Sequence, residues 1–242
     1  MKKAYLNWSS GKDSALALYY ILKDKEYAVE NLLTTTNAEL NRVSMHGLRN
    51  EVVKRQAKSL QIPLKLVEVP SDTSMQSYNS TMQKVTSELL EQGYTHSIFG
   101  DIFLQDLREY RENQLAQVRM EAVFPLWKKN TGQLMRDFLN LKFKAIVICT
   151  NSKYLDKSFC GRIIDDQFLK DLPANVDPCG ENGEFHTFVF DGPIFKNSID
   201  FKIGEKVKKS YAPTTSGDDS CFSNSDDRSW DTDFWYCDLL VE

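Results

Sequence analysis

The chain has 242 residues, of which 41% are hydrophobic and 26% charged, with a formal net charge of -4. This length suffices for one large core or for a domain with a smaller companion. The weak negative charge and the lack of a basic block argue against duplex nucleic acid as a partner. No apolar run is long enough for a membrane span. The five cysteines form no CxxC pair, which predicts a reduced, cytoplasmic protein without structural zinc.

The first two thirds of the chain alternate short apolar runs with helical periods. In the first helix, Ala15, Leu18, Tyr19 and Leu22 recur on one face. Strands are predicted at residues 4–8, 29–35, 63–69, 95–99 and 144–149, and further helices at residues 47–60, 75–89, 103–118 and 132–141. This alternation predicts an α/β fold, in which helices cover both faces of a parallel, Rossmann-like sheet.

The character of the sequence changes after residue 155. We therefore expect a nucleotide-binding domain at residues 1–155 and a smaller β-containing, substrate-side region at residues 156–211, with strands at residues 185–190 and 199–207. Residues 212–233 are rich in Ser, Asp and Thr and are expected to form a mobile loop. The apolar residues 234–240 then predict a final strand.

Residues 9–14, SSGKDS, join the first strand to the first helix. Small residues let backbone amides approach an anion, and the start of a helix attracts negative charge. Lys12 adds a cation, and three serines add hydroxyl donors. The GxxxxGK[ST] spacing of a Walker loop is absent. The sequence thus favours a phosphate loop, and the alternative is a serine-rich helix cap with Asp13 in the first turn.

Ligands of parallel α/β sheets bind beyond the carboxyl ends of the strands. Thr34, Gly100, Asp101 and Thr150 are predicted to lie there too. An acid that follows Gly100 can hold Mg²⁺ against phosphates, or it can cap the next helix.

The loop resembles the SGGxDS loop of the N-type ATP pyrophosphatases, with Ser10 in place of the usual first glycine. Five other stretches resemble one branch of that superfamily, the diphthine–ammonia ligase family, and are closest to its bacterial branch. They are residues 42–47 (RVSMHG), 100–102 (GDI), 125–127 (PLW), 161–162 (GR) and 180–187 (GENGEFHT). They follow the family's order, and the resemblance covers roughly residues 3–193.

The resemblance implies an adenine nucleotide alpha hydrolase-like fold that uses ATP and Mg²⁺. A substrate carboxylate would attack the α-phosphate and form an acyl-adenylate, and ammonia would then displace AMP. Diphthine on a translation elongation factor is the family's known substrate class. The acceptor of this chain, small or protein-borne, stays open, as does its oligomeric state. Two alternatives are an ATP-binding sensor without turnover and an ATP pyrophosphatase that modifies a nucleic-acid base.

The candidate site residues form three sets. The expected ATP-binding set is Ser9, Ser10, Gly11, Lys12, Asp13, Ser14, Thr34 and Gly100. The expected catalytic set is Lys12, Asp13, Asp101, Glu181 and Glu184, and Asp101 is also the candidate Mg²⁺ ligand. The expected set for substrate and ammonium is Ser44, His46, Arg111, Glu112 and His186.

Each set has a structural alternative. A carboxylate near a histidine can bind ammonium or accept its proton, but a lone histidine such as His46 is often a hydrogen-bonded structural residue. The charged run at residues 108–112 can equally be a solvated helix face. Residues 177–187 can equally be a glycine-rich turn that leads into a strand.

Overall fold

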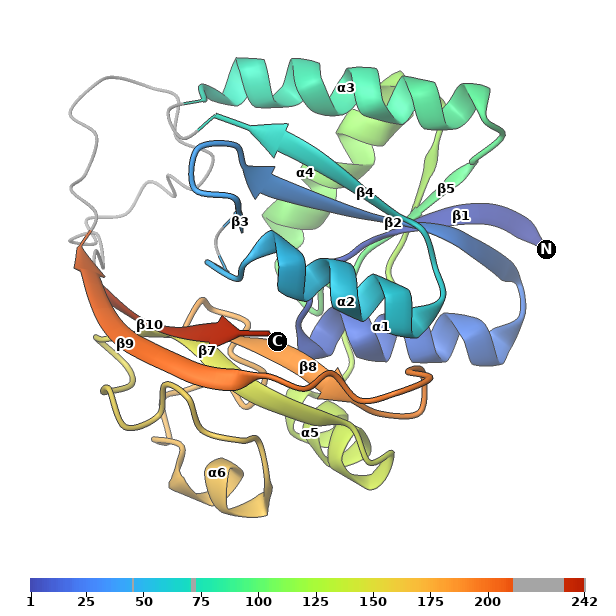
Figure 1. Cartoon of the computed structure of the whole chain (residues 1–242). Helices are drawn as coiled ribbons and strands as arrows, with labels where there is room; N and C mark the ends of the chain where they lie inside the picture. The colour runs from blue at the N-terminus through green and yellow to red at the C-terminus, as the bar shows by residue number, and fades with distance from the viewer. Residues whose placement is uncertain (45, 71–72, 211–232, 242) are drawn as a thin grey trace.

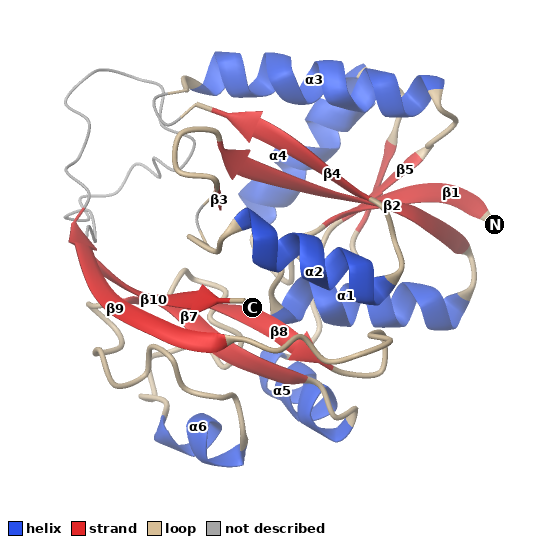
Figure 2. Ribbon diagram, in the orientation of Figure 1, coloured by secondary structure: helices blue, strands red, loops and turns tan. Residues whose placement is uncertain are grey.

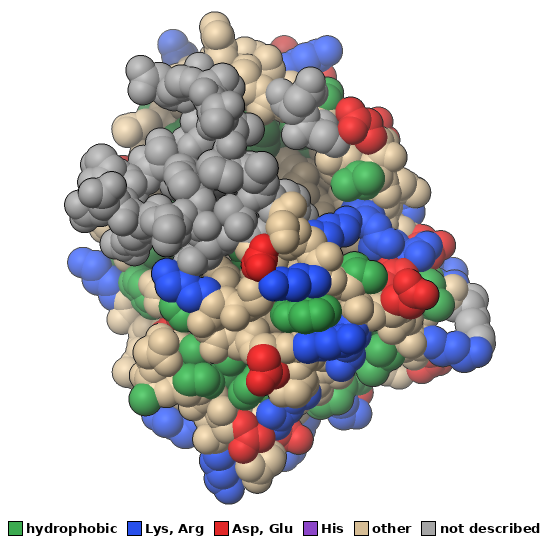
Figure 3. All heavy atoms as spheres, turned by 90° about the vertical axis from the view of Figure 1, so that its left-hand side faces the viewer, with side chains coloured by type: hydrophobic (Ala, Val, Ile, Leu, Met, Phe, Trp, Pro, Cys, Tyr) green, Lys and Arg blue, Asp and Glu red, His purple; other side chains and the backbone are tan. Residues whose placement is uncertain are grey.

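The computed structural model describes residues 1–44, 46–70, 73–210 and 233–241. In these residues the chain forms a mostly parallel sheet and a separate antiparallel sheet, with helices packed against both (Figures 1 and 2). The face seen in Figure 3 mixes basic and acidic side chains. None of the described helices has both the length and the apolar character needed to cross a membrane.

The predicted parallel sheet is confirmed. Its parallel strands, in spatial order, are β4 (Leu64–Val69), β2 (Tyr27–Asn37), β1 (Lys2–Asn7), β5 (His96–Ile98) and β6 (Glu121–Val123). The short β3 (Arg42–Val43) pairs antiparallel with the end of β2. Because β2 and β5 lie on opposite sides of β1, the chain changes direction across the sheet at β1.

Helices cover both faces of this sheet, as the periodicity predicted. They are α1 (Lys12–Asp24) and α2 (Asn50–Leu60) on one face, and α3 (Met75–Glu91) and α4 (Gln105–Gln117) on the other (Figure 1). Helices α3 and α4 pack against the sheet through the buried side chains of Val85, Leu89 and Leu115. In α2, Val52, Val53, Gln56, Ala57 and Leu60 are buried on one side. Their spacing of three and four residues is that of a helix face.

The predicted strand at residues 144–149 forms, but its place in the parallel sheet is wrong. It is β7 (Lys144–Asn151), and it lies in the antiparallel sheet between β8 (Phe185–Asp191) and β10 (Asp233–Leu240). Thr150 therefore does not end a parallel strand. A continuous apolar run signals a strand buried on both faces, and it carries no information about which sheet buries it. β7 thus joins the region that we expected to begin at residue 156.

The fourth strand of the second sheet is β9 (Lys202–Ser210), which begins later than the predicted residue 199. Helices α5 (Thr131–Asn140) and α6 (Asp166–Asp171) accompany this sheet. The final strand is confirmed by β10, whereas the expected mobile loop at residues 212–233 lies almost wholly outside the described residues. The cysteines that the structure describes are all free and buried.

Helices α1 and α2 lie between the two sheets (Figure 1), and buried polar contacts join the sheets there. The amide of Val189 in β8 donates to the carbonyl of Ser10 at 3.0 Å. The fully buried Gln56 donates to that same carbonyl at 3.0 Å and to the carbonyl of Val189 at 2.7 Å. Trp8 in turn donates its indole N–H to Gln56 at 2.9 Å. The second sheet is thereby fixed directly to the predicted phosphate loop.

Candidate active site

The predicted phosphate loop lies where the strand order reverses. β1 ends at Asn7 and its neighbour β5 ends at Ile98, so residues 9–14 and Gly100 leave the sheet side by side. A Cβ atom at Gly100 would lie 2.9 Å from the backbone carbon of Asp13. Glycine is therefore required for this close approach. The switch point of an open α/β sheet is the usual place for a ligand.

The loop itself has the features of an anion cradle. Helix α1 begins at Lys12 without a side-chain cap, because its N-cap residue is Gly11. The amide of Lys12 donates to the hydroxyl of Thr187 in β8 at 3.0 Å. Ser9 accepts from the amide of Gly11 and donates to Ser14. No side chain among the described residues accepts from the other backbone amides of this first turn. Those amides are therefore available to a phosphate.

Ser10 adopts a left-handed backbone with φ of 74°, although it is not glycine. Its side chain is fully buried, and its hydroxyl has no hydrogen-bond partner among the described residues. Such a backbone costs a residue with a Cβ about 1–2 kcal/mol. The loop thus keeps a conformation that favours glycine, and the bonds from Val189 and Gln56 to the Ser10 carbonyl hold it there.

We expect Ser10→Gly to raise the free energy of unfolding by ~1 kcal/mol, because relief of the left-handed strain exceeds the extra entropy that glycine gains in the unfolded chain. Urea unfolding of the two proteins measures the difference. Ser10→Ala is the control, since it removes the hydroxyl but keeps the strain. A glycine variant no more stable than the alanine variant would contradict the strain argument.

Lys12 is buried, with 2% of its surface exposed, although it is a charged residue at the start of a helix. Its ammonium contacts both carboxylate oxygens of Asp13, at 2.8 and 2.9 Å, and lies 5.5 Å from the centre of the Phe185 ring. Burial has the largest single effect and lowers the pKa of Lys12, but the charge and hydrogen bonds of Asp13, together with the charges of Cys179 and Glu181, outweigh burial and raise this pKa overall. Lys12 is therefore a fixed cation between the two sheets.

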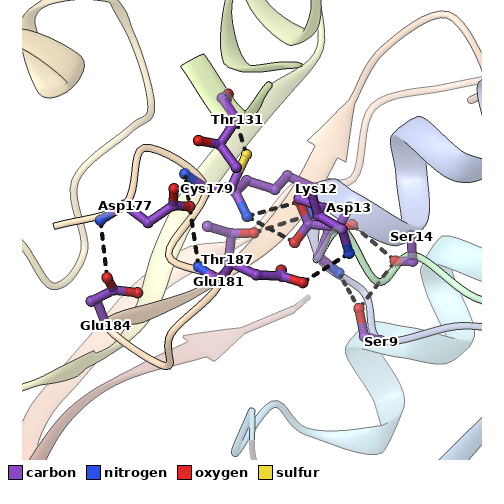
Figure 4. A network of polar contacts seen from close by, with 12 residues as sticks. Ser9, Lys12, Asp13, Ser14, Thr131, Asp177, Cys179, Glu181, Glu184 and Thr187 are labelled. Atoms are coloured by element: carbon purple, nitrogen blue, oxygen red, sulfur yellow. Dashed lines mark hydrogen bonds and ion pairs between the residues drawn. The ribbon is translucent and has the colours of Figure 1, made fainter. Parts of the chain in front are cut away.

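The carboxylates of Asp13 and Glu181 lie near the ammonium of Lys12 (Figure 4). Glu181 accepts a hydrogen bond from the amide of Ile102 at 2.8 Å, and burial, followed by the charge of Asp13, raises its pKa to about 7. Burial likewise raises the pKa of Asp13, against the opposing effect of Lys12. The structure therefore brings Lys12, Asp13 and Glu181 together, as predicted, and concentrates more negative than positive charge there.

Asp101, the candidate Mg²⁺ ligand, already has a partner. Its carboxylate lies 2.9 Å from Nε of Arg111 and accepts from the same guanidinium at 3.2 Å. The structure describes no group of three His, Cys, Asp or Glu side chains placed to hold a metal by themselves. Mg²⁺ commonly takes one or two carboxylates together with phosphate oxygens and water. The carboxylates beside the phosphate loop fit that donor set.

Glu184 and Asp177 shape the loop that carries Glu181 (Figure 4). Glu184, 1% exposed, accepts from the amide of Asp177 at 2.9 Å and from the amide of Asn182 at 2.9 Å. Asp177 accepts from the amides of Cys179 at 2.8 Å and Glu181 at 3.3 Å. Catalysis by Glu184 stays a prediction, but both of its oxygens already hold this loop.

Two other candidates make their described contacts within the first sheet and its helices. Glu112 pairs with Arg108 along α4 at 2.7 Å. Thr34, 3% exposed, donates to the carbonyl of Trp8 at 2.7 Å and so braces the strand before the phosphate loop. These contacts do not bear on ligand binding, so the binding roles of Glu112 and Thr34 stay predictions.

The predicted substrate-side histidines meet each other. The rings of His46 and His186 stack with centroids 4.4 Å apart. Burial, followed by the charge of Lys12, lowers the pKa of His186 to about 4. Burial, followed by His186 and then Lys12, lowers the pKa of His46 well below its ordinary value. Both rings are therefore neutral at neutral pH. Nδ1 of His46 is buried without a hydrogen-bond partner among the described residues. Ser44 precedes His46 in the same turn.

Comparison with known proteins agrees with this arrangement. The model of the diphthamide synthase N-terminal domain matches residues 1–112, and that of the diphthamide synthase C-terminal domain matches residues 130–216. Together the two ranges cover most of the chain and include the phosphate loop and the Glu181 loop. The chain belongs to the diphthamide synthase family.

Relatives in this family are named diphthine–ammonia ligase. The Bos taurus protein is 30% identical over 46% of this chain and 45% of its own length, and the Homo sapiens protein is 30% identical over 43% and 41%. The matched stretch thus spans less than half of each. The Danio rerio protein is 24% identical over 82% of this chain and 86% of its own.

A solved structure is also similar to this diphthamide synthase family chain. It is a predicted subunit of a tRNA methyltransferase from Methanocaldococcus jannaschii. It shares 18% identity over 65% of this chain and 82% of its own, with a TM-score of 0.39.

Sequence reasoning missed several residues that shape the candidate site of this family member. Thr187 caps the amide of Lys12, and Phe185 lies against its ammonium. Both lie in or beside the glycine-rich stretch, whose resemblance to the family was the available signal. Gln56 looked like an ordinary polar residue of an amphipathic helix. Only its burial and its two contacts across the sheets reveal its role.

Proposed function

We propose that this chain is an ATP-dependent ligase that activates a substrate carboxylate, releases pyrophosphate and transfers ammonia to the activated carbon. The observation that carries this proposal is the buried Lys12 at the start of a helix whose N-cap residue is glycine, near the carboxylate of Glu181 from the family's C-terminal region. The name shared by the relatives supports the same reaction class. Diphthine is the proposed acceptor class, on that name alone.

In this proposal the first-turn amides and Lys12 bind the β- and γ-phosphates of ATP. Mg²⁺ would lie among the phosphates and the nearby carboxylates, with Asp101 as a candidate, and would neutralise charge on the leaving pyrophosphate. Asp13 keeps the ammonium of Lys12 in place through its two contacts. Positioning and charge neutralisation then supply most of the acceleration.

The histidine pair suits a neutral nitrogen nucleophile. Both rings stay uncharged at neutral pH and lie within the field of Lys12. A neutral imidazole accepts an N–H hydrogen bond and could therefore orient ammonia. Glu181, with its pKa near 7, is the proposed acceptor of a proton.

The cleavage position tests the reaction class. Turnover of α-labelled ATP, with Mg²⁺, ammonium and an acceptor-containing cell-extract fraction, should yield labelled AMP, because the loop lacks Walker spacing and resembles a pyrophosphatase loop. Thin-layer separation identifies the product. ADP as the main labelled product would rule out the proposal, and tight ATP binding without either product in every fraction would favour the sensor alternative.

A further inference from the structure

Residues 42–49 form a tight hairpin that carries His46, with residue 45 outside the described part. Arg42 and Arg49 form an antiparallel bridge, and the amide of Val43 donates to the carbonyl of Leu48 at 2.7 Å. The amide of Ser44 donates to the carbonyl of Thr35 in β2 at 3.1 Å. These backbone bonds fix the shape of the 42–49 hairpin and attach it to the first sheet. They do not attach it to the second sheet, where His186 lies.

The last strand, β10, contacts the hairpin at two points two residues apart. The carboxylate of Asp238 accepts from Arg42 at 2.9 Å and, through both oxygens, from Nε and NH2 of Arg49 at 3.0 and 2.7 Å. A Cβ atom at Gly47 would lie 2.9 Å from the ring of Tyr236. Gly47 therefore lets the hairpin lie directly on β10.

Asp238 is an ionised clamp. Burial alone would raise its pKa, but the hydrogen bonds and the charges of Arg49 and Arg42 together outweigh burial and lower it. A paired, two-oxygen contact with a guanidinium adds orientation to the attraction. Arg42 also donates to the carbonyl of Gly47 at 2.6 Å, so its guanidinium joins the carboxylate to the tip of the hairpin. The partners are 21–38% exposed, which weakens each contact relative to a buried one.

Docking on β10 brings the hairpin tip against the start of β8, where the ring of His46 meets that of His186. We propose that Asp238 is a positioning residue: it clamps Arg42 and Arg49, docks the 42–49 hairpin on the second sheet, and so holds His46 against His186 in the candidate site. This inference deepens the proposed function and rests on it, because docking matters for catalysis only if the stacked histidines contact the substrate of the proposed ligase.

The state of the His46 ring reports docking without any activity. The chain has three histidines, His46, His96 and His186, so their imidazole signals can be assigned by single substitution and titrated by ¹⁵N NMR. The groups that face His46 are His186 and Lys12. In Asp238→Asn the hairpin should leave the second sheet for part of the time, and the apparent pKa of His46 should rise by about one unit as water reaches the ring. Arg49→Lys, which keeps the charge but loses the paired contact, should give a smaller rise.

Asp191→Asn is the matched control. It breaks an ion pair with Lys144 at 2.8 Å in the same sheet, away from the hairpin, and should leave the pKa of His46 unchanged. Mg-ATP affinity should fall less than threefold in all three variants, because the phosphate loop is untouched. An unchanged pKa of His46 in folded Asp238→Asn, or an equal shift in the Asp191 control, would overturn the clamp. Failure of pyrophosphate release would refute the proposed function and leave this result standing. If Asp238→Asn does not fold, Arg49→Lys alone decides.

Discussion

Lys12→Ala should lower turnover at saturating Mg-ATP by more than 100-fold and destabilise the fold by ~2–3 kcal/mol. The alanine leaves the carboxylate of Asp13 without its cation. Breaking one side of a fully buried pair costs about 3–5 kcal/mol, and the 27% exposure of the Asp13 side chain reduces this cost. The effect on the rate has a separate origin. Charge accumulates on pyrophosphate as it leaves, so Lys12 stabilises the transition state more than it stabilises bound ATP.

The two effects are measured independently. Single-turnover pyrophosphate release, in an extract fraction that supports the wild-type enzyme, gives the rate at saturating ATP, and urea unfolding gives the stability. Lys23→Ala is the control, because Lys23 is exposed near the end of the same helix. A folded Lys12→Ala protein that turns over at the wild-type rate would make Lys12 a simple binding residue. That outcome would favour the ATP-binding sensor.

The parts of the fold that local sequence determines were predictable. The strand-to-helix loop at residues 9–14, the helix that follows it and the alternating strands all follow from runs of a few consecutive residues, and the structure confirms their positions in the chain. The sheet membership of β7 is not local. It depends on pairing with β8 and with β10, which follows about 80 residues later in the chain.

The site shows the same division. Lys12, Asp13 and Glu181 were predicted from motifs, and the structure brings them together. The burial of Lys12 could not be predicted from neighbouring residues, because its ammonium lies near Phe185 and its amide donates to Thr187, both in the second sheet. The contacts of Asp238 with Arg42 and Arg49 were equally inaccessible, since the three residues are joined only after both sheets have packed.

The two carboxylates of the glycine-rich loop should respond in opposite ways to the same substitution. Glu181→Gln should stabilise the protein by ~2 kcal/mol at pH 8 while lowering turnover by ~100-fold, the usual size of a general acid–base contribution. The amide oxygen of the substituted side chain can still accept from the amide of Ile102, so the hydrogen bond at 2.8 Å is preserved. What the substitution removes is a buried negative charge beside Asp13.

The pH dependence of this gain follows from linkage. Folding raises the pKa of Glu181 from 4.5 to about 7, so the native state binds a proton more tightly than the unfolded state. The stability associated with that proton is complete below pH 4.5 and is lost as the pH rises through 7. The shift corresponds to ~3 kcal/mol, which partial exposure reduces. Wild-type stability should therefore fall between these pH values, and the glutamine variant should show a flatter profile.

Glu184→Gln is the contrasting variant. Both oxygens of Glu184 accept backbone N–H groups, and an amide NH₂ cannot accept, so one buried donor is left without a partner. We expect a loss of ~2 kcal/mol at pH 8, where Glu181→Gln gains stability. Urea unfolding of the three proteins at pH 5 and pH 8 decides the matter. If Glu181→Gln gave the same stability change at both pH values, the pKa of Glu181 would not be raised in the folded protein. Its proposed role as proton acceptor would then lose its physical basis.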